Sequence, residues 1–455
     1  LRDPAREDAE LLFNIGTCEK ELGRFDDAAA TFTLCTETFP RDAGGWANLA
    51  ECCFERASFE DGTRLARRAV QLDPALGPEL AKSRIARGDA LQSTGALEEA
   101  AAHYAAALAL VPADGATLKN ATLCLLEANR GEEAIALCRE VLAADPGNLT
   151  AKLGMEWLLS QLVPAWHVPM MNERERNQAF HDGLQAVVAP GSSVFEVGTG
   201  SGLLAMMAAR LGAQSVVTCE AVPLVAATAR TIVAANGYAD RVTVLARPST
   251  AVQVGAGKDL PAKADILVHE IFSSELLGEN VLAAIEDAKA RLLKPGGVIL
   301  PSAASIMIAL VGGDDGLAGN LHAGESFGFD LSAFNAVQPR KRPLAREDLA
   351  PVLLGEPVEA FRFDFGKHAS FPAERKQLQL AVTRAGTCHG IIQWIRIELA
   401  PGIVFENHPS RPRAVSNWQQ AVYTFPAPVQ LEAGASVAVD AWHDRTRPWF
   451  ERANG

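Results

Sequence analysis

The segment ILVHEIFSSELLGENVL, residues 266–282, carries two glutamates nine residues apart. Glu270 directly follows an apolar run that is typical of a buried strand, and Glu279 follows a short loop. Two carboxylates on one loop suit a planar cation with several N–H donors, because a guanidinium pairs with carboxylates in a bidentate fork. Orientation then matters more than a strong base, since a guanidinium pKa above about 12 prevents prior deprotonation. Alternatively, both are solvated loop carboxylates.

A glycine-rich loop upstream predicts a site for a nucleotide-like cofactor. The loop follows an apolar run and carries three alternate glycines, Gly198, Gly200 and Gly202. Glycines there let the backbone come close to a ligand. Glu196 precedes them, and Glu220 closes the next apolar run, where a carboxylate can accept hydrogen bonds from both ribose hydroxyls. A dinucleotide-binding loop would want glycine at position 203, where Leu203 stands.

The elements that must position these residues alternate along the middle third of the chain. VFEV, SVVTCEA, RVTVLA and ADILVHE read as strands, and each later one is preceded by a helical stretch. This alternation predicts a parallel, doubly wound sheet. Acid, three glycines and acid at this spacing resemble the S-adenosylmethionine (AdoMet) fold of class I methyltransferases. A nicotinamide-dependent dehydrogenase and a purely structural sheet are the alternatives.

The first third is a repeat. Four prolines, at positions 40, 74, 112 and 146, each end a helical pattern, and small residues keep the same phase before them. The pattern resembles the tetratricopeptide repeat, a 34-residue helix–turn–helix unit. About four units cover residues 8–150 as a helical solenoid, which usually presents its surface to peptides or partner proteins. The alternative is an unrelated helical bundle.

Residues 166–455 resemble protein arginine methyltransferases, closest to the branch that carries tetratricopeptide repeats. Glu270 and Glu279 match that family's double-E loop and would be catalytic. MMNERERN resembles the helix that covers the cofactor, which implies Met170 beside the reacting methyl and Arg176 on the AdoMet carboxylate. RPST matches the adenine-contacting segment. The expected cofactor-binding set is Met170, Arg176, Glu196, Gly198, Gly200, Gly202, Leu203, Glu220, Ala221, Ser249 and Thr250.

SNWQQAVYTFP resembles the family's T-H-W loop. Trp418 holds the tryptophan position and Asn417 replaces the histidine, so both are predicted to bind substrate. Trp418 could instead be barrel core, and Arg176 a surface residue of a charged helix. The family's aromatic N-terminal helix is not recognisable, and the chain has one catalytic module where close relatives have two in tandem. These departures leave the substrate and the product type open.

The last third alternates short strands rich in β-branched and aromatic residues with glycine and proline. This predicts an antiparallel domain, and the resemblance implies a β-barrel. The expected domains are repeats at 8–150, an AdoMet-binding domain at 160–298 and a barrel at 299–455. An irregular arm is inserted at about 311–345. Since the arm grips a second catalytic module in the family, a homodimer is expected here, or a monomer whose repeats cover that surface.

Composition limits the kinds of partner and ligand that we expect for this chain. The net charge of −13 argues against nucleic-acid binding, and no apolar run is long enough to span a membrane. Eight cysteines without a C-x-x-C motif fit a reduced cytoplasmic protein, and nine scattered histidines predict no metal site. Because the chain begins with leucine, we expect its natural N-terminus to lie upstream.

The leading hypothesis is methyl transfer from AdoMet to arginine in a protein or peptide that the repeats recruit. Methylation of a small guanidino compound or of another nitrogen is the second. A repeat-based interaction protein with an inactive methyltransferase domain is the third.

Overall fold

The computed structural model describes residues 4–112, 114–313, 315–344, 351–410 and 417–453. The chain divides into two compact units, residues 1–164 and 165–455. Within the described ranges, no helix combines the length and apolarity that a membrane crossing requires.

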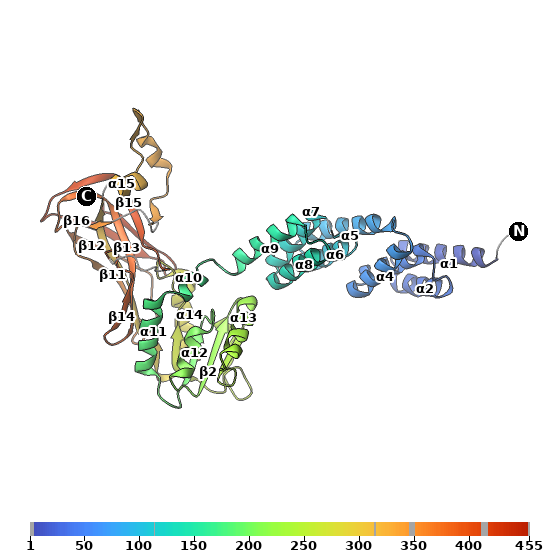
Figure 1. The fold of residues 1–455 in the computed structure, drawn as a ribbon, viewed down its shortest axis with the longest axis horizontal. Helices are drawn as coiled ribbons and strands as arrows, with labels where there is room; N and C mark the ends of the chain where they lie inside the picture. The colour runs from blue at the N-terminus through green and yellow to red at the C-terminus, as the bar shows by residue number, and fades with distance from the viewer. Residues whose placement is uncertain (1–3, 113, 314, 345–350, 411–416, 454–455) are drawn as a thin grey trace. The chain divides into compact units, whose positions relative to one another are not determined.

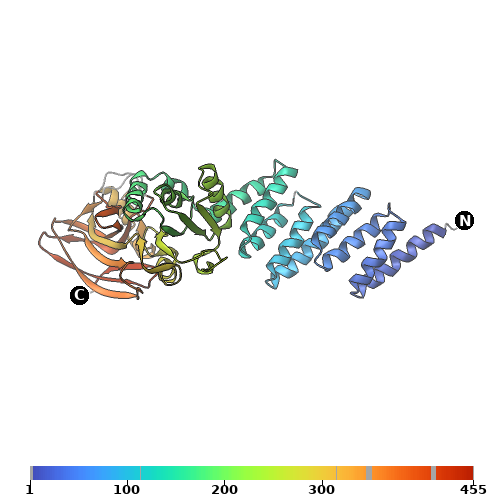
Figure 2. The ribbon, with the colours of Figure 1, turned by 90° about the horizontal axis from the view of Figure 1, so that it is seen from below.

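The first unit consists of helices that pair in sequence order and lie side by side along the array (Figure 2). Four helix pairs, α1/α2 to α7/α8, are followed by a ninth helix. Their bounds are α1 Pro4–Glu21, α2 Phe25–Thr38, α3 Ala43–Glu55, α4 Phe59–Leu72, α5 Leu76–Ser93, α6 Leu97–Leu108, α7 Gly115–Glu127, α8 Gly131–Ala144 and α9 Leu149–Leu162.

The phased small residues let aromatic rings reach the helix backbone. A Cβ atom on Gly16 would lie 2.8 Å from Phe32 Cζ, and one on Gly88 would lie 2.7 Å from Tyr104 Cε1. Side chains at these positions would push the paired helices apart, because interiors are packed to crystal-like density. These glycines therefore set the spacing within the α1/α2 and α5/α6 pairs.

The phased prolines also mark the starts of the following helices. Three of them are followed two residues later by a side chain that caps the next helix: Asp42, Asp114 and Asn148. Asp42 accepts hydrogen bonds from the amides of Gly44 and Gly45, and Asn148 accepts one from Ala151. Each cap satisfies amides that the first helical turn leaves without partners.

The second unit contains a parallel five-stranded sheet, which lies around the label β2 in Figure 1. Its strand order is β3-β2-β1-β4-β5. The strands are β1 Ser193–Val197, β2 Ser215–Glu220, β3 Val242–Ala246, β4 Ala264–His269 and β5 Leu293–Leu300. The strand order reverses between β1 and β4. In open parallel sheets ligands bind beside such a switch point, at the C-terminal ends of the strands. The parallel sheet reaches Leu300, because β5 pairs with β4 through residues 298–300.

The helices of this part precede the sheet or connect its strands. They are α10 His167–Met171, α11 Arg174–Val187, α12 Leu203–Arg210, α13 Pro223–Ala235 and α14 Val281–Arg291, with short 3₁₀ turns η1 Ser249–Ala251 and η2 Gly278–Asn280. Buried valines, leucines and isoleucines of the strands form one continuous core with α11, α12, α13 and α14 and with the antiparallel domain. The five-stranded sheet is therefore a rigid platform for whatever its C-terminal edge carries.

The remaining strands form antiparallel sheets. A seven-stranded sheet has the path β10-β6-β13-β15-β9, with β11 on β6 and β14 on β13, and a three-stranded sheet has the order β12-β16-β17. The bounds are β6 Ala303–Gly312, β9 Lys341–Pro343, β10 Val352–Leu353, β11 Val358–Asp364, β12 Glu374–Ala381, β13 Gly386–Ala400, β14 Ile403–Glu406, β15 Ala421–Leu431, β16 Ser436–His443 and β17 Pro448–Arg452.

The antiparallel domain is barrel-like, as the resemblance implied, but it is not closed, because its described strands divide between a seven-stranded and a three-stranded sheet, apart from a small two-stranded hairpin. The edge strands β9 and β10 have only three and two residues, so they offer few backbone groups through which a sheet could close.

The expected irregular arm is partly ordered. It contains helix α15 (Asp315–Leu321), the small hairpin β7 Glu325–Ser326 and β8 Phe329–Asp330, and the 3₁₀ turn η3 (Ser332–Val337) before it returns in β9. Figure 1 shows this arm projecting beyond the strands of the antiparallel domain.

Candidate functional site

The loop between Glu270 and Asn280 leaves the C-terminal end of β4 in an unusual backbone conformation. Three of its non-glycine residues have positive φ: Leu276 at 73°, Glu279 at 59° and Asn280 at 57°. Such conformations cost about 1–3 kcal/mol each and persist only when the surrounding structure enforces them. The loop is therefore a constrained feature of the fold, as expected for a segment that must present two carboxylates.

Glu270 is buried and paired. Its carboxylate forms an ion pair with Arg176 of α11, and the two side chains are only 6% and 4% exposed. Burial raises the pKa of Glu270, and the guanidinium of Arg176 opposes that rise. A buried carboxylate without this partner would be strongly destabilised, so the pair holds negative charge in place at the strand end.

Arg176 itself keeps unused capacity. Its Nη1 donates to Asn177 Oδ1 at 2.8 Å, and its guanidinium lies 5.1 Å from the Phe180 ring and 5.6 Å from the Trp418 ring. Its buried Nε has no hydrogen-bond partner within the part of the chain that the structure describes. Arg176 is thus no surface residue, and one of its donors remains available to an anionic group.

Glu196 of β1 is a second buried carboxyl group near Glu270. It is 1% exposed, and its Oε2 has no hydrogen-bond partner among the described residues. Burial raises the pKa of Glu196 to about 8, and the charges of Glu220 and Glu270 add to the rise. Three carboxyl groups near the C-terminal edge of the sheet favour a positively charged ligand, because such a ligand stabilises their ionised forms.

Glu220 ends β2 and faces the glycine-rich loop. Its Oε2 accepts from the amide of Gly200 and its Oε1 accepts from the amide of Val222, both at 3.1 Å. All three loop glycines have positive φ. A Cβ atom on Gly198 would lie 2.7 Å from Ile271 Cγ2, whereas one on Gly200 would meet nothing within 4 Å. The loop therefore packs against the double-E segment on one side and is open on another.

The other expected cofactor residues lie after the strands of the same sheet edge or in the preceding helix. Leu203 begins α12, and Ala221 follows β2 as an exposed residue. Ser249 begins η1 after β3, where its carbonyl accepts a hydrogen bond from Arg291 Nη2 at 2.9 Å. Thr250 is exposed, and the half-buried Met170 lies in α10.

Glu279 differs from Glu270 in its surroundings. As a whole residue it is exposed, yet desolvation of its carboxyl group raises its pKa, and the nearby His167 of α10 opposes the rise. Its charge also raises the pKa of Glu270, which places the two carboxylates within electrostatic reach of each other. The double-E pair therefore combines one buried and one accessible carboxylate.

Trp418 supports the loop from the antiparallel domain. It is buried, and its indole Nε1 donates to the carbonyl of Phe272 at 3.1 Å. The next residue, Gln419, donates its amide to Ser274 Oγ at 3.0 Å. These bonds hold the backbone of the double-E loop in place, which is the role that the described contacts of Trp418 support. Substrate binding by Trp418 stays a prediction.

Two residues near the site were not expected from the sequence. The buried Glu173 precedes α11, and its Oε2 accepts a hydrogen bond from the amide of Asn417 at 2.9 Å. His167 influences Glu279, as described above. The available signal for both was local: Glu173 lies three residues before Arg176, and His167 lies three residues before Met170.

Other polar residues are structural. His269 is fully buried between Phe272 and Phe365, with ring centroids 5.1 Å away in each case. Burial lowers its pKa to about 3, so its imidazole is neutral. Within the described ranges, no cluster of three or more histidine, cysteine, aspartate or glutamate side chains could hold a metal ion.

Comparison with known families identifies each part of the chain. Residues 181–304 match the family model described as ribosomal protein L11 methyltransferase, and residues 302–451 match the arginine methyltransferase oligomerization subdomain. Residues 13–76 and 91–158 match tetratricopeptide repeats. The expected repeats are therefore confirmed.

Individual relatives point the same way. An arginine N(omega)-methyltransferase of Streptomyces achromogenes subsp. streptozoticus is 39% identical over 286 residues, which cover 62% of this chain and 78% of that protein. Protein arginine N-methyltransferase 7 of Aedes aegypti is 30% identical over 330 residues, covering 62% of this chain and 47% of the relative. The chain thus spans about half the length of the latter.

A solved structure supports the fold. The chain matches the Trypanosoma brucei PRMT1 enzyme–prozyme heterotetrameric complex with AdoHcy at a TM-score of 0.54 and 19% identity. The match covers 64% of this chain and 98% of the other. At that identity the likeness concerns the fold alone.

Proposed function

Because this chain belongs to the arginine methyltransferase family, we propose that it transfers a methyl group from AdoMet to a terminal nitrogen of an arginine guanidinium. The observation that carries the proposal is the double-E loop. It places a buried carboxylate, Glu270, and an accessible one, Glu279, within electrostatic reach at the sheet edge.

The residues at the sheet edge fit AdoMet, which supplies a methyl group activated by a sulfonium. The unpartnered Oε2 of Glu196 and the free Nε donor of Arg176 match an amino acid moiety with one ammonium and one carboxylate. Gly200 leaves open space at the loop, and Glu220 is assigned to the ribose hydroxyls. Ser249 and Thr250 are assigned to the adenine.

The chemical step depends on holding the guanidinium. Glu270 and Glu279 would accept hydrogen bonds from its nitrogens and keep the positive charge on one side of the group. The remaining terminal nitrogen is then directed toward the methyl donor, and its proton leaves as the new bond forms. Orientation of this kind can supply several kcal/mol of the rate enhancement, about 7–11 at most.

Two substrate classes compete. The repeats favour a protein substrate, because α4, α6 and α8 line a groove of about 1130 Å³ on the first unit. The similarity to a Streptomyces enzyme named arginine N(omega)-methyltransferase favours free arginine as the second candidate. We propose protein arginine as the substrate, with the repeats recruiting it.

Two further properties belong to the same proposal. The match to an oligomerization subdomain supports a homodimer formed through the arm. All eight cysteines are free thiols, which supports a reducing, cytoplasmic environment.

The test is methyl transfer by the wild type and by Glu279→Gln and Glu270→Gln variants. Labelled AdoMet is incubated with free L-arginine, an arginine-containing peptide or a cell lysate, and the labelled residue is identified by mass spectrometry. Breaking one partner of a desolvated charge pair costs about 2–5 kcal/mol, so each variant should be slower by roughly 30- to 5,000-fold.

The controls separate binding from chemistry. Calorimetry should find AdoMet affinity nearly intact in Glu279→Gln, and Glu356→Gln, which alters an exposed glutamate of the antiparallel domain, should keep wild-type activity. Transfer to free L-arginine but not to any peptide or protein would decide for the second candidate. Wild-type turnover in both double-E variants contradicts the arginine proposal.

A further inference from the structure

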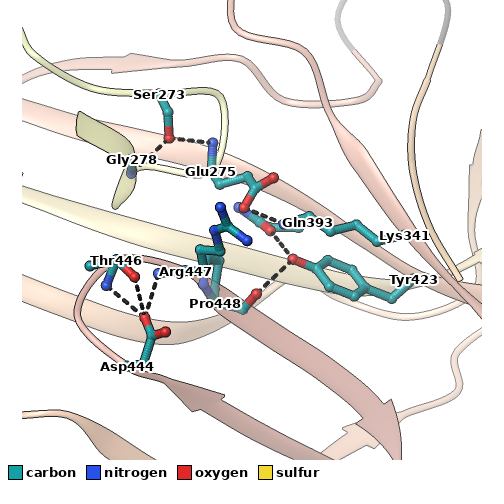
Figure 3. A network of polar contacts seen from close by, with 10 residues as sticks. All are labelled: Ser273, Glu275, Gly278, Lys341, Gln393, Tyr423, Asp444, Thr446, Arg447 and Pro448. Carbon is teal, nitrogen blue, oxygen red and sulfur yellow. Dashed lines mark hydrogen bonds and ion pairs between the residues drawn. The ribbon is translucent and has the colours of Figure 1, made fainter. Parts of the chain in front are cut away.

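An ion pair joins the double-E loop to the end of the arm. Glu275, midway between the two glutamates of the site, pairs with Lys341, the first residue of β9 (Figure 3). The side chains of Lys341 and Glu275 are 22% and 29% exposed, so the pair is partly shielded from solvent. Lys341 follows directly on the arm, and its strand pairs with β15 through Tyr423.

Lys341 is itself held by the core of the antiparallel domain. Its ammonium lies 5.4 Å from the centroid of the Tyr423 ring, a cation–π distance. The hydroxyl of Tyr423 lies 2.9 Å from Gln393 Oε1 and 3.2 Å from the Pro448 carbonyl, so strands β13, β15 and β17 fix the ring (Figure 3). The position of the Lys341 side chain is thus fixed by its contacts, unlike that of a mobile surface lysine.

The loop on the other side of the pair is a compact turn. Ser273 Oγ accepts hydrogen bonds from the amides of Glu275 at 3.2 Å and Gly278 at 3.0 Å. A Cβ atom on Gly278 would lie 2.6 Å from Ser273 Cβ, so the two ends of the turn are in contact. Residues 273–278 therefore form one compact turn, so a displacement of Glu275 also displaces Glu279, which follows the turn.

Glu279 is the member of the double-E pair that needs such support. Glu270 is anchored by its ion pair with Arg176 and by its place at the end of β4. Glu279 is exposed and has a left-handed backbone, with φ of 59°, which the loop alone would relax. Of the loop anchors described above, the one at Phe272 lies ahead of the turn, and the one at Ser274 holds the start of the turn, five residues before Glu279.

We propose that Lys341 is a positioning residue for the guanidinium site. Acting through Glu275, it holds the 273–278 turn so that Glu279 faces the substrate. The identity of the substrate in this inference rests on the proposed function. The contact from Lys341 through Glu275 to the turn does not depend on it. Because β9 is also the return strand of the arm, this ion pair connects the arm to the loop that carries Glu279.

The test compares Lys341→Met and Glu275→Gln with the conservative Lys341→Arg and with the charge exchange Lys341→Glu/Glu275→Lys. Lys294→Met is the matched control, because Lys294 also pairs with a partly exposed carboxylate, Asp265, where β4 and β5 begin. Three quantities are measured in the full-length protein: kcat and KM for the methyl acceptor, AdoHcy affinity by calorimetry, and deuterium uptake of residues 270–280.

Lys341→Met and Glu275→Gln should raise KM for the acceptor about fivefold, as expected for loss of one partly exposed pair, and should speed deuterium uptake in the loop. AdoHcy affinity should change less than about twofold. Lys341→Arg should behave as wild type, the charge exchange should recover part of the loss, and Lys294→Met should leave KM and the loop unchanged.

Unchanged KM and unchanged loop exchange in Lys341→Met overturn the inference. If the wild type transfers no methyl group to any arginine acceptor, the proposed function fails while deuterium uptake alone decides the positioning role. Faster exchange in Lys341→Met then still supports it, and equal exchange rejects it.

Discussion

Glu220 shows how a single side chain can serve two purposes at the sheet edge. Its carboxylate already orders the glycine-rich loop through the amides of Gly200 and Val222. In the proposed complex it also accepts both ribose hydroxyls, since each carboxylate oxygen has more than one lone-pair position. Its removal therefore loosens the loop and deprives the ribose of its acceptor.

Glu220→Ala should weaken AdoMet and AdoHcy binding by about 1.5–3 kcal/mol, roughly 10- to 150-fold, because hydrogen bonds to a charged group are lost. Calorimetry with AdoHcy measures this directly. Glu432→Ala, at an exposed glutamate far along the chain in the antiparallel domain, serves as the control. Unchanged affinity in Glu220→Ala contradicts the assignment of this residue to the ribose.

Individual residues differ in how well the sequence predicts them. Glu196, Glu220 and Glu270 follow from strand ends, because parallel strands bring their C-terminal ends to one edge. The pairing of Arg176 with Glu270 was not predicted. The two residues are 94 positions apart, and pattern reasoning gives no distance between a covering helix and a strand end.

At the scale of elements, the repeats were the easiest part to predict. Their signals are local: a proline that ends a helix and small residues at a fixed phase before it. The parallel strands were also located closely, because each is a short apolar run before a loop. Whether the barrel closes could not be predicted. Closure depends on the lengths of edge strands such as β9 and β10, which are set by long-range pairing.

One phased glycine, Gly88, and one glycine outside the phase, Gly154, allow a test in which the two substitutions have opposite effects on stability. Gly88→Ala places a methyl group 2.7 Å from Tyr104 Cε1 inside the α5/α6 pair, so it should destabilise the repeats by about 1–3 kcal/mol. Gly154→Ala in α9 meets only Cys138 Sγ at 3.8 Å, so helix propensity should stabilise it by up to about 1 kcal/mol.

Urea unfolding followed by circular dichroism measures both changes in stability, because the described part of the repeat unit consists of helices, whose loss the circular dichroism signal reports. Equal stability of Gly88→Ala and the wild type would mean that the ring of Tyr104 adjusts without cost. In that case the small residues do not set the helix spacing.

At the scale of the whole molecule, the arm carries apolar side chains that a solvated loop would not need. Phe327 is 96% exposed, and Phe329, Leu331, Phe334 and Val337 are also exposed. They lie in or beside the hairpin β7/β8 and the turn η3, so they form one apolar region of the arm. Exposed apolar patches of this kind mark interaction sites.

A second copy of the chain is the proposed partner for this region. The arm would dock on the cofactor domain of the other copy, and a two-fold pair closes these contacts without forming filaments. Light scattering should therefore find a dimer for the intact protein and a monomer for Phe327→Ser/Phe334→Ser. Deletion of residues 314–338 should have the same effect.

The link from the arm through Lys341 and Glu275 adds a functional consequence to dimer loss. The monomeric Phe327→Ser/Phe334→Ser protein should show a raised KM for the acceptor and faster deuterium uptake in residues 270–280, although neither substitution touches that loop. Val404→Ser, which removes an exposed apolar side chain from β14, should remain dimeric and fully active. A monomer in every case at micromolar concentration would assign the arm another partner, and a dimer that survives the double substitution would place the interface elsewhere.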